Sequence, residues 1–128
     1  MTTPTERKQL LLVEDDADQR NAIHDRLKLY GYAVACAGDG LTAMDMLQTD
    51  PFHGMLLDLN LPTQHGSEVL LQTRENFPEM PVLVMSASQS GIRAAKAAHG
   101  EACAYLMKPF GVRDFETALH SCFGQNRT

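Results

Sequence analysis

The chain has 128 residues and a mass of 14.1 kDa, which is the size of one ordinary domain and leaves no room for a second sizeable one. Its 44% apolar and 21% charged residues are a typical globular balance, so we expect a fold that needs no structural metal. Cys36, Cys103 and Cys122 are far apart and form no Cys-x-x-Cys pair, which excludes a disulfide framework and the usual zinc spacing. We interpret them as reduced thiols of a cytoplasmic protein.

The net charge of −5 is unevenly distributed: residues 1–64 carry ten acidic and five basic residues, and residues 65–128 carry six of each. A net acidic chain without a basic cluster binds nucleic acid poorly, so we expect no direct nucleic-acid partner. The polar start and the shortness of every apolar run predict neither a signal peptide nor a membrane span. The acidic first half is where a cation is expected.

Short apolar segments alternate with amphipathic ones along the whole chain, and the pattern repeats five times. Strands are predicted at 9–14, 33–37, 54–59, 81–85 and 102–107. Helices are predicted at 16–30, 39–50, 67–77, 90–99 and 112–123. The strands are apolar without alternation, which is typical of a parallel sheet covered by helices on both faces. We therefore expect an α/β domain with a doubly wound parallel sheet.

Polar residues interrupt the predicted strands only at their carboxyl ends. They are Glu14, Asp15 and Asp16 after the first strand, Asp58 in the third, Ser86 after the fourth, and Lys108 and Pro109 after the fifth. Carboxyl ends of parallel strands meet at one edge of the sheet, and doubly wound sheets bind ligands there. We expect these side chains to share one crevice.

Carboxylates that converge on one crevice repel each other, so they hold protons or neutralise a cation. Oxygen ligands without His or Cys favour a hard ion, and Mg²⁺ is commonly held by one or two carboxylates, water and a phosphate. A hydroxyl and an ammonium group opposite would complete a clamp for a phosphoryl group. A carboxylate can itself take a phosphoryl group as an acyl phosphate. The sequence thus predicts magnesium-dependent phosphoryl chemistry at this edge.

The structural alternative is that residues 14–16 only cap the following helix and complement its dipole. We favour that role for Asp16 alone. It does not explain Asp58, which lies in an apolar strand where an unpaired charge is costly. Lys108, between an apolar strand and a proline, is equally unexplained.

With these residues in place, the sequence resembles the receiver domain of two-component response regulators over about residues 9–123. The motifs that carry the resemblance are Val13-Glu14-Asp15-Asp16, Leu57-Asp58-Leu59-Asn60-Leu61-Pro62 with Gly66, Met85-Ser86-Ala87, and Tyr105-Leu106-Met107-Lys108-Pro109-Phe110. The resemblance implies a flavodoxin-like (βα)5 fold with strand order 2-1-3-4-5. It also implies one receiver domain over 9–123, with tails at 1–8 and 124–128.

The resemblance implies that Asp58 is the phosphoacceptor. It further implies that Asp15 is the principal Mg²⁺ ligand, that Glu14 helps through water, and that Asp58 and the main-chain carbonyl of Asn60 complete the set. The metal would stabilise charge on the transferring phosphoryl oxygens.

Three further roles follow from the same resemblance. Ser86 and Lys108 would each bind a phosphoryl oxygen, and the Lys108–Pro109 peptide would be cis. Tyr105 would be the switch aromatic, which turns inward when the Ser86 hydroxyl is drawn toward the phosphoryl group. The alternative for Tyr105 is an ordinary half-buried strand tyrosine.

The partners that the resemblance implies are a sensor histidine kinase or a histidine phosphotransfer protein as donor, and an effector protein or domain downstream. The fourth helix, fifth strand and fifth helix would form the output surface, through which a homodimer is also conceivable. The chain would be a signalling receiver rather than an enzyme, although it would catalyse its own phosphoryl transfer and slow autodephosphorylation.

Three other functions share parts of this pattern. A phosphohydrolase with an Asp nucleophile normally has a second Asp two residues later, where this chain has Asn60, and a cap domain for which there is no room. A flavodoxin-like cofactor binder needs a phosphate loop where residues 14–16 are acidic. A receiver that serves only as an unphosphorylated docking module fits less well, because the aspartates, serine and lysine of the motifs are all intact.

Overall fold

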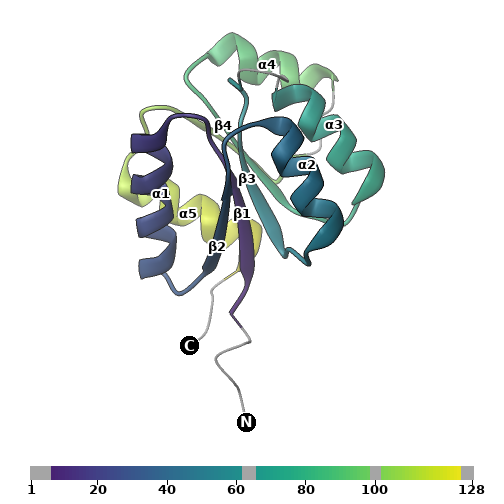
Figure 1. Cartoon of the computed structure of the whole chain (residues 1–128). Helices are drawn as coiled ribbons and strands as arrows, with labels where there is room; N and C mark the ends of the chain where they lie inside the picture. The colour runs from purple at the N-terminus through teal and green to yellow at the C-terminus, as the bar shows by residue number, and fades with distance from the viewer. Residues whose placement is uncertain (1–6, 62–65, 99–101, 125–128) are drawn as a thin grey trace.

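The computed structural model describes residues 7–61, 66–98 and 102–124, and within them five strands alternate with five helices (Figure 1). The strands are β1 (Gln9–Val13), β2 (Ala33–Ala37), β3 (Gly54–Asp58), β4 (Val82–Ser86) and β5 (Ala104–Met107). The helices are α1 (Ala17–Leu29), α2 (Gly40–Thr49), α3 (Gly66–Asn76), α4 (Gln89–Ala98) and α5 (Val112–Phe123).

The strands form one parallel sheet in the order β2-β1-β3-β4-β5. Val13 pairs with Leu57, and Asp58 pairs with Met85, so the three central strands end at the same level. The chain order reverses between β1 and β3, and this switch point is where such sheets hold ligands. The predicted parallel sheet and its strand order are confirmed.

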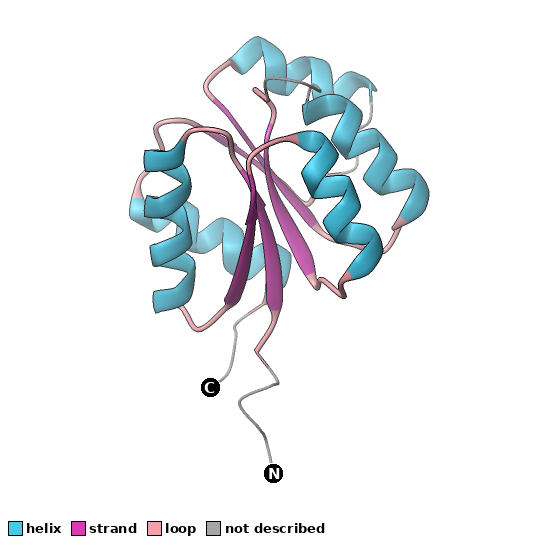
Figure 2. Cartoon of the chain, in the orientation of Figure 1, coloured by secondary structure: helices cyan, strands magenta, loops and turns pink. Residues whose placement is uncertain are grey.

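Helices cover both faces of the sheet (Figure 2). α1 and α5 pack on one face, and α2, α3 and α4 pack on the other. Residues of β1 alternate between the two cores: Leu10 and Leu12 lie under α1 and α5, and Leu11 and Val13 lie under the opposite helices. All four side chains are completely buried. Burying each of them stabilises the fold by about 2 kcal/mol of transfer free energy, so the strand has apolar residues on both of its faces.

The predicted element boundaries differ from the observed ones by one or two residues. Asp16 is the N-cap of α1, and its carboxylate accepts from the Gln19 amide at 2.9 Å, as the structural alternative for this residue proposed. β5 begins at Ala104 rather than at residue 102, because its ladder with β4 starts where Ala104 meets Leu83. The predicted end of the fourth helix at His99, and residues 1–6 and 125–128 of the two tails, lie outside the described residues.

One glycine is required where α3 begins. A Cβ on Gly66 would lie 2.4 Å from the Cα of Leu59 and 2.6 Å from the carbonyl oxygen of Asp58. Both atoms belong to the backbone that carries Asp58, so they cannot move aside without moving Asp58. The Gly66 amide donates to the Leu59 carbonyl at 3.0 Å, which fixes this approach.

The described chain enters and leaves at the amino edge of the sheet (Figure 1). The Tyr32 hydroxyl donates to the carbonyl of Gly124 at 2.8 Å, and the Lys8 ammonium donates to the carbonyl of Phe123. The acidic strand ends lie at the opposite edge. Among the described helices, none is long and apolar enough to cross a membrane.

Candidate functional site

Three carboxylates meet at the carboxyl ends of β1 and β3. Glu14 is 1% exposed and Asp58 is 3% exposed, whereas Asp15 is exposed to solvent. Each offers one carboxylate oxygen, and these oxygens lie within 4.8 Å of one another. The predicted acidic crevice is therefore present, with two of its members removed from water.

Lys108 lies against this cluster from the end of β5. Its ammonium donates to Glu14 Oε1 at 2.7 Å and to Asp58 Oδ2 at 2.9 Å, and the Lys108 side chain is only 15% exposed. The Lys108 amide donates to the carbonyl of Ser86 at 2.8 Å, and the Lys108–Pro109 peptide is cis. Lys108 thus neutralises part of the charge that the two buried acids share.

Burial and the neighbouring charges shift the protonation of this cluster. Burial raises the pKa of Glu14 from 4.5 to about 6; the hydrogen bond to Lys108 opposes the rise, and the nearby Asp58 adds to it. Burial by itself would lower the pKa of Lys108, but its hydrogen bonds to Glu14 and Asp58 and their charges raise it overall. Lys108 therefore stays a cation in the crevice.

Backbone groups fix the orientation of the acids. The Asn60 amide donates to Asp58 Oδ1 at 2.9 Å, so both oxygens of Asp58 are hydrogen-bonded. The guanidinium of Arg20 donates to the carbonyls of Glu14 at 2.8 Å and Asp15 at 3.2 Å, which holds the turn between β1 and α1. Asn60 itself is exposed beside the crevice.

The hydroxyl of Ser86 is buried, and its hydrogen bonds within the described residues go to Ser88 rather than to Asp58. It accepts from the Ser88 amide at 3.0 Å and donates to the Ser88 carbonyl at 3.3 Å. These bonds lie within the loop from β4 to α4. Ser86 is at the predicted strand end, with its hydroxyl engaged locally.

Tyr105 lies on the same face of the sheet as Ser86, because it pairs with Val84, two residues earlier in β4. The Lys96 ammonium of α4 lies 5.0 Å from the centre of the Tyr105 ring, within cation–π range. The Tyr105 hydroxyl is buried and has no hydrogen-bond partner within the described residues.

Sequence reasoning missed Gln19, whose Oε1 accepts from the Lys108 ammonium at 2.7 Å. A Gln three residues after an Asp N-cap is the pattern of a capping box, which indicates a structural role. Here the Asp16 amide donates to Glu14 Oε2 at 3.3 Å, and the Gln19 side chain is turned to the site instead. Arg20 was missed too, because a basic residue in a first helical turn gives no signal of backbone contacts.

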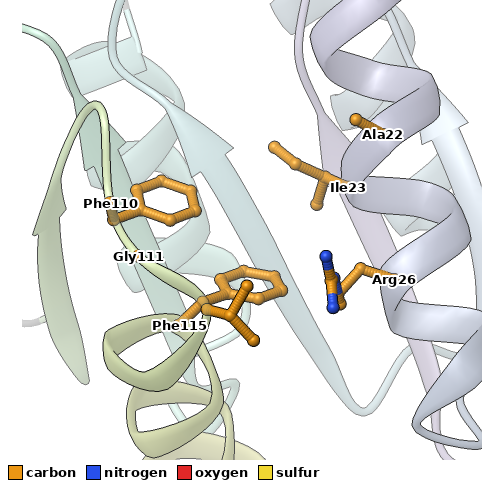
Figure 3. Close-up of a pocket in the computed structure, with 7 residues that line it drawn as sticks. Ala22, Ile23, Arg26, Phe110, Gly111 and Phe115 are labelled. Atoms are coloured by element: carbon orange, nitrogen blue, oxygen red, sulfur yellow. The ribbon is translucent and has the colours of Figure 1, made fainter.

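A groove runs from the site along α1. Its part nearest the acids has a volume of about 430 Å³ and is lined by Gln19 and Ile23 of α1 and by Lys108 and Pro109. It continues into a hollow of about 210 Å³, where Phe110 and Phe115 face Ile23 and Arg26 (Figure 3). The two phenyl rings stack with centroids 5.3 Å apart. The groove therefore borders the crevice at Lys108.

The donor set suits a hard divalent cation: Glu14, Asp15 and Asp58 offer only oxygen, and no His or Cys joins them in the described cluster. Lys108, opposite these acids, suits an anionic group that bridges metal and ammonium. The arrangement can hold a magnesium ion and the oxygens of a phosphoryl group beside a buried carboxylate.

Comparison with known proteins shows the family to which the chain belongs. A family model described as the response regulator receiver domain matches residues 10–120. The transcriptional regulatory protein QseB of Haemophilus influenzae is 35% identical over 113 residues, which are 88% of this chain and 51% of QseB. The response regulator protein FleR of Pseudomonas aeruginosa is 35% identical over 105 residues, which are 82% of this chain and 22% of FleR.

A solved structure adds the fold. The receiver domain of the sensor histidine kinase PA1611 from Pseudomonas aeruginosa, crystallised with a magnesium ion coordinated in its active-site cleft, is 27% identical with a TM-score of 0.83. The match covers 92% of this chain and 98% of that one. The chain spans about half the length of the first curated relatives: 51% of QseB, and 46% of the response regulator MprA of Mycobacterium avium. By its sequence and its fold, the chain belongs to the response regulator receiver domains of two-component signalling systems.

Proposed function

We propose that the domain accepts a phosphoryl group on Asp58 in a Mg²⁺-dependent reaction, with a phosphohistidine of a sensor kinase or phosphotransfer protein as donor. The observation that carries the proposal is the setting of Asp58. Its carboxylate is buried, one oxygen accepts from Lys108 and the other from the Asn60 amide, and two further acids lie beside it. Burying a charged carboxylate costs desolvation energy, so packing alone does not explain Asp58 at this position. A carboxylate held in a fixed orientation at a strand end is suited to act as a nucleophile.

The proposed metal ligands are Asp15, Asp58 and the main-chain carbonyl of Asn60, with Glu14 acting through water. The donor chemistry of the cluster fits Mg²⁺, and the PA1611 receiver coordinates the same ion in its active-site cleft. When bound, the ion would neutralise charge on the phosphoryl oxygens.

The chain's own residues supply position and charge. An Asp58 oxygen attacks the phosphorus, the bond to the donor nitrogen breaks, and an acyl phosphate forms. Lys108 remains charged at neutral pH and can transfer one of its hydrogen bonds from Asp58 to a phosphoryl oxygen. The Ser86 hydroxyl would exchange its bonds to Ser88 for one to another phosphoryl oxygen.

The output would follow from Ser86 and Tyr105. Withdrawal of the Ser86 hydroxyl changes the loop that precedes α4, and Tyr105, with its unpaired hydroxyl, turns inward. We propose that the surface of α4, β5 and α5 then binds an effector protein or domain, or a second copy of the chain. In this proposal the domain, residues 9–123, is a cytoplasmic signalling receiver whose only chemistry is its own phosphorylation and dephosphorylation.

Intact mass after incubation with a small phosphodonor and Mg²⁺ tests the proposal. We expect a gain of one alkali-labile phosphoryl group, which is absent in Asp58→Asn and absent with a chelator. An Asp45→Asn variant is the matched control, because it makes the same change from carboxylate to amide at an exposed position of α2. Modification of Asp58→Asn at the wild-type rate would refute Asp58 as acceptor. No gain under conditions that modify a known receiver would favour a docking module instead.

A further inference from the structure

Two of the three cysteines, distant in sequence, meet at the amino edge of the sheet. Cys103 immediately precedes β5, and its amide donates to the carbonyl of Val82 at the start of β4 at 2.7 Å. α5 runs back antiparallel to β5, so its last turn, which contains Cys122, returns to the same edge. The hydrogen bond from Tyr32 to Gly124 places the end of α5 there independently.

The last turn of α5 brings Cys122 onto the core between this helix and the sheet. Phe123 points toward the inner strands, since its ring occupies the space where a Cβ of Gly54 in β3 would lie. Cys122, one residue earlier and about 100° around the helix, packs against the same core cluster as Ala104, the residue next to Cys103 in the chain.

Cys103 is near enough to Cys122 to affect its ionisation. Burial raises the pKa of the Cys122 thiol, and the neighbouring Cys103 raises it further. Cys103 is exposed, whereas Cys122 is half-buried. Cys36 lies in β2 at the other edge of the sheet, separated from β5 by three strands.

We propose that Cys103 and Cys122 form a reversible intramolecular disulfide when a small-molecule disulfide oxidises the domain. The exposed thiolate of Cys103 attacks one sulfur of the oxidant, and the other sulfur leaves as a thiolate and takes up the proton that Cys103 lost. The Cys122 thiolate then attacks Cys103 Sγ and releases the second half of the oxidant, which takes up the proton of Cys122. The two thiols lose two electrons in all, and one small-molecule disulfide becomes two thiols.

The order of the two steps follows from the environment. Attack requires a thiolate, and Cys122, which burial keeps protonated, is the poorer first nucleophile. Once Cys103 is a neutral mixed disulfide, it carries no charge that opposes ionisation of Cys122. The first step therefore prepares the second.

The bond would tie β5 to the end of α5, two elements of the proposed output surface, at the edge opposite Asp58. The inference does not depend on phosphorylation, and we expect the rate of Asp58 modification to change less than about twofold because the bridge lies a full strand length away. Closing the loop between the two cysteines restricts the unfolded chain, so the oxidised protein should have a Tm higher by several degrees.

The test treats the whole chain with oxidised glutathione and counts free thiols after unfolding in an alkylating agent. We expect the three thiols of the reduced chain to fall to one, a mass loss of two hydrogens, and a peptide that links Cys103 to Cys122, all reversed by dithiothreitol. Cys36→Ser is the matched control and should leave the linked peptide in place. Cys103→Ser and Cys122→Ser should each abolish it, the latter leaving glutathione on Cys103.

The wild-type peptide map decides the outcome even if one variant folds poorly. Glutathione that stays on Cys103 of the wild-type chain, without a linked peptide, would overturn the proposal. A bridge between two chains, or one that includes Cys36, would overturn it as well.

Discussion

Lys108 is the residue that holds the site together electrostatically, because its ammonium is bonded to both buried acids and to Gln19. A Lys108→Ala variant would leave Glu14 and Asp58 as neighbouring buried charges. We expect an unfolding free energy lower by about 3 kcal/mol without Mg²⁺. Phosphorylation should persist at a reduced rate, while the response of α4, β5 and α5 is lost. Amide spectra with and without a phosphoryl mimic would show this, and a wild-type response in the variant would contradict it.

Glu14 provides a pH dependence with a definite sign. Its folded-state pKa is raised to about 6 from 4.5, so the folded protein binds this proton more tightly than the unfolded chain does. The stability that it contributes is present at low pH and is lost as the pH rises through about 6. Relative to Glu14→Gln, the metal-free wild type should lose about 2 kcal/mol of unfolding free energy between about pH 4 and pH 7. Urea unfolding with a chelator measures it, and a difference independent of pH would contradict it.

Gln19 shares Lys108 with the acids, so its removal should strengthen the pairing of Lys108 with Glu14 and Asp58. A cation must compete with that pairing. We expect Gln19→Leu to weaken Mg²⁺ binding by about threefold, or about 0.7 kcal/mol. Calorimetric titration measures the affinity, and Gln48→Leu, at an exposed position of α2, is the control. Equal affinities in the two variants would assign Gln19 no role in the site.

At the scale of elements, the sequence allowed the strands to be predicted because the three central ones, β1, β3 and β4, are buried on both faces and are therefore apolar up to their carboxyl ends. The edge strands β2 and β5 are only half-buried, but their apolar residues still mark them. Their ends were less predictable. The start of β5 depends on where Ala104 meets Leu83 of another strand, and the apolar residues before it carry no sign of that pairing. The convergence of Asp58 and Glu14 could be predicted because parallel strands end together.

What could not be predicted are contacts that depend on side-chain direction. The sequence shows Gln19 as a helix-capping residue, and only the folded turn aims it at Lys108. The position of Lys96 over Tyr105 depends on how α4 lies against β5, which no periodicity encodes.

The start of α3 offers a test of packing near the site. Gly66→Ala would bring a methyl group against the backbone of Leu59, and we expect a loss of about 3 kcal/mol in unfolding free energy. Gly111→Ala is the matched control, since nothing lies within 4 Å of its Cβ position and its φ of −79° suits any residue. Denaturant unfolding of both variants measures the difference. Equal stabilities would mean that α3 shifts without cost.

At the scale of the whole molecule, the acid cluster links stability to the cation. Three carboxylates destabilise the metal-free fold by mutual repulsion, and a ligand that binds only the folded state stabilises it. With Mg²⁺ at about 100 times its Kd, the unfolding free energy should rise by about 2.7 kcal/mol. Thermal unfolding measures this rise. Asp15→Asn should be more stable than wild type without metal and should gain little from it; an equal gain would exclude Asp15 as a ligand.

The described chain begins and ends at one edge of the sheet, and the acids lie at the other. A tag or surface linker added beyond either end would therefore hold the molecule by its far side. In a domain immobilised in this way, the groove along α1 and the crevice at Asp58 would face the solution that contains the binding partner. Binding assays on a sensor surface can thus use either end for attachment without blocking the site.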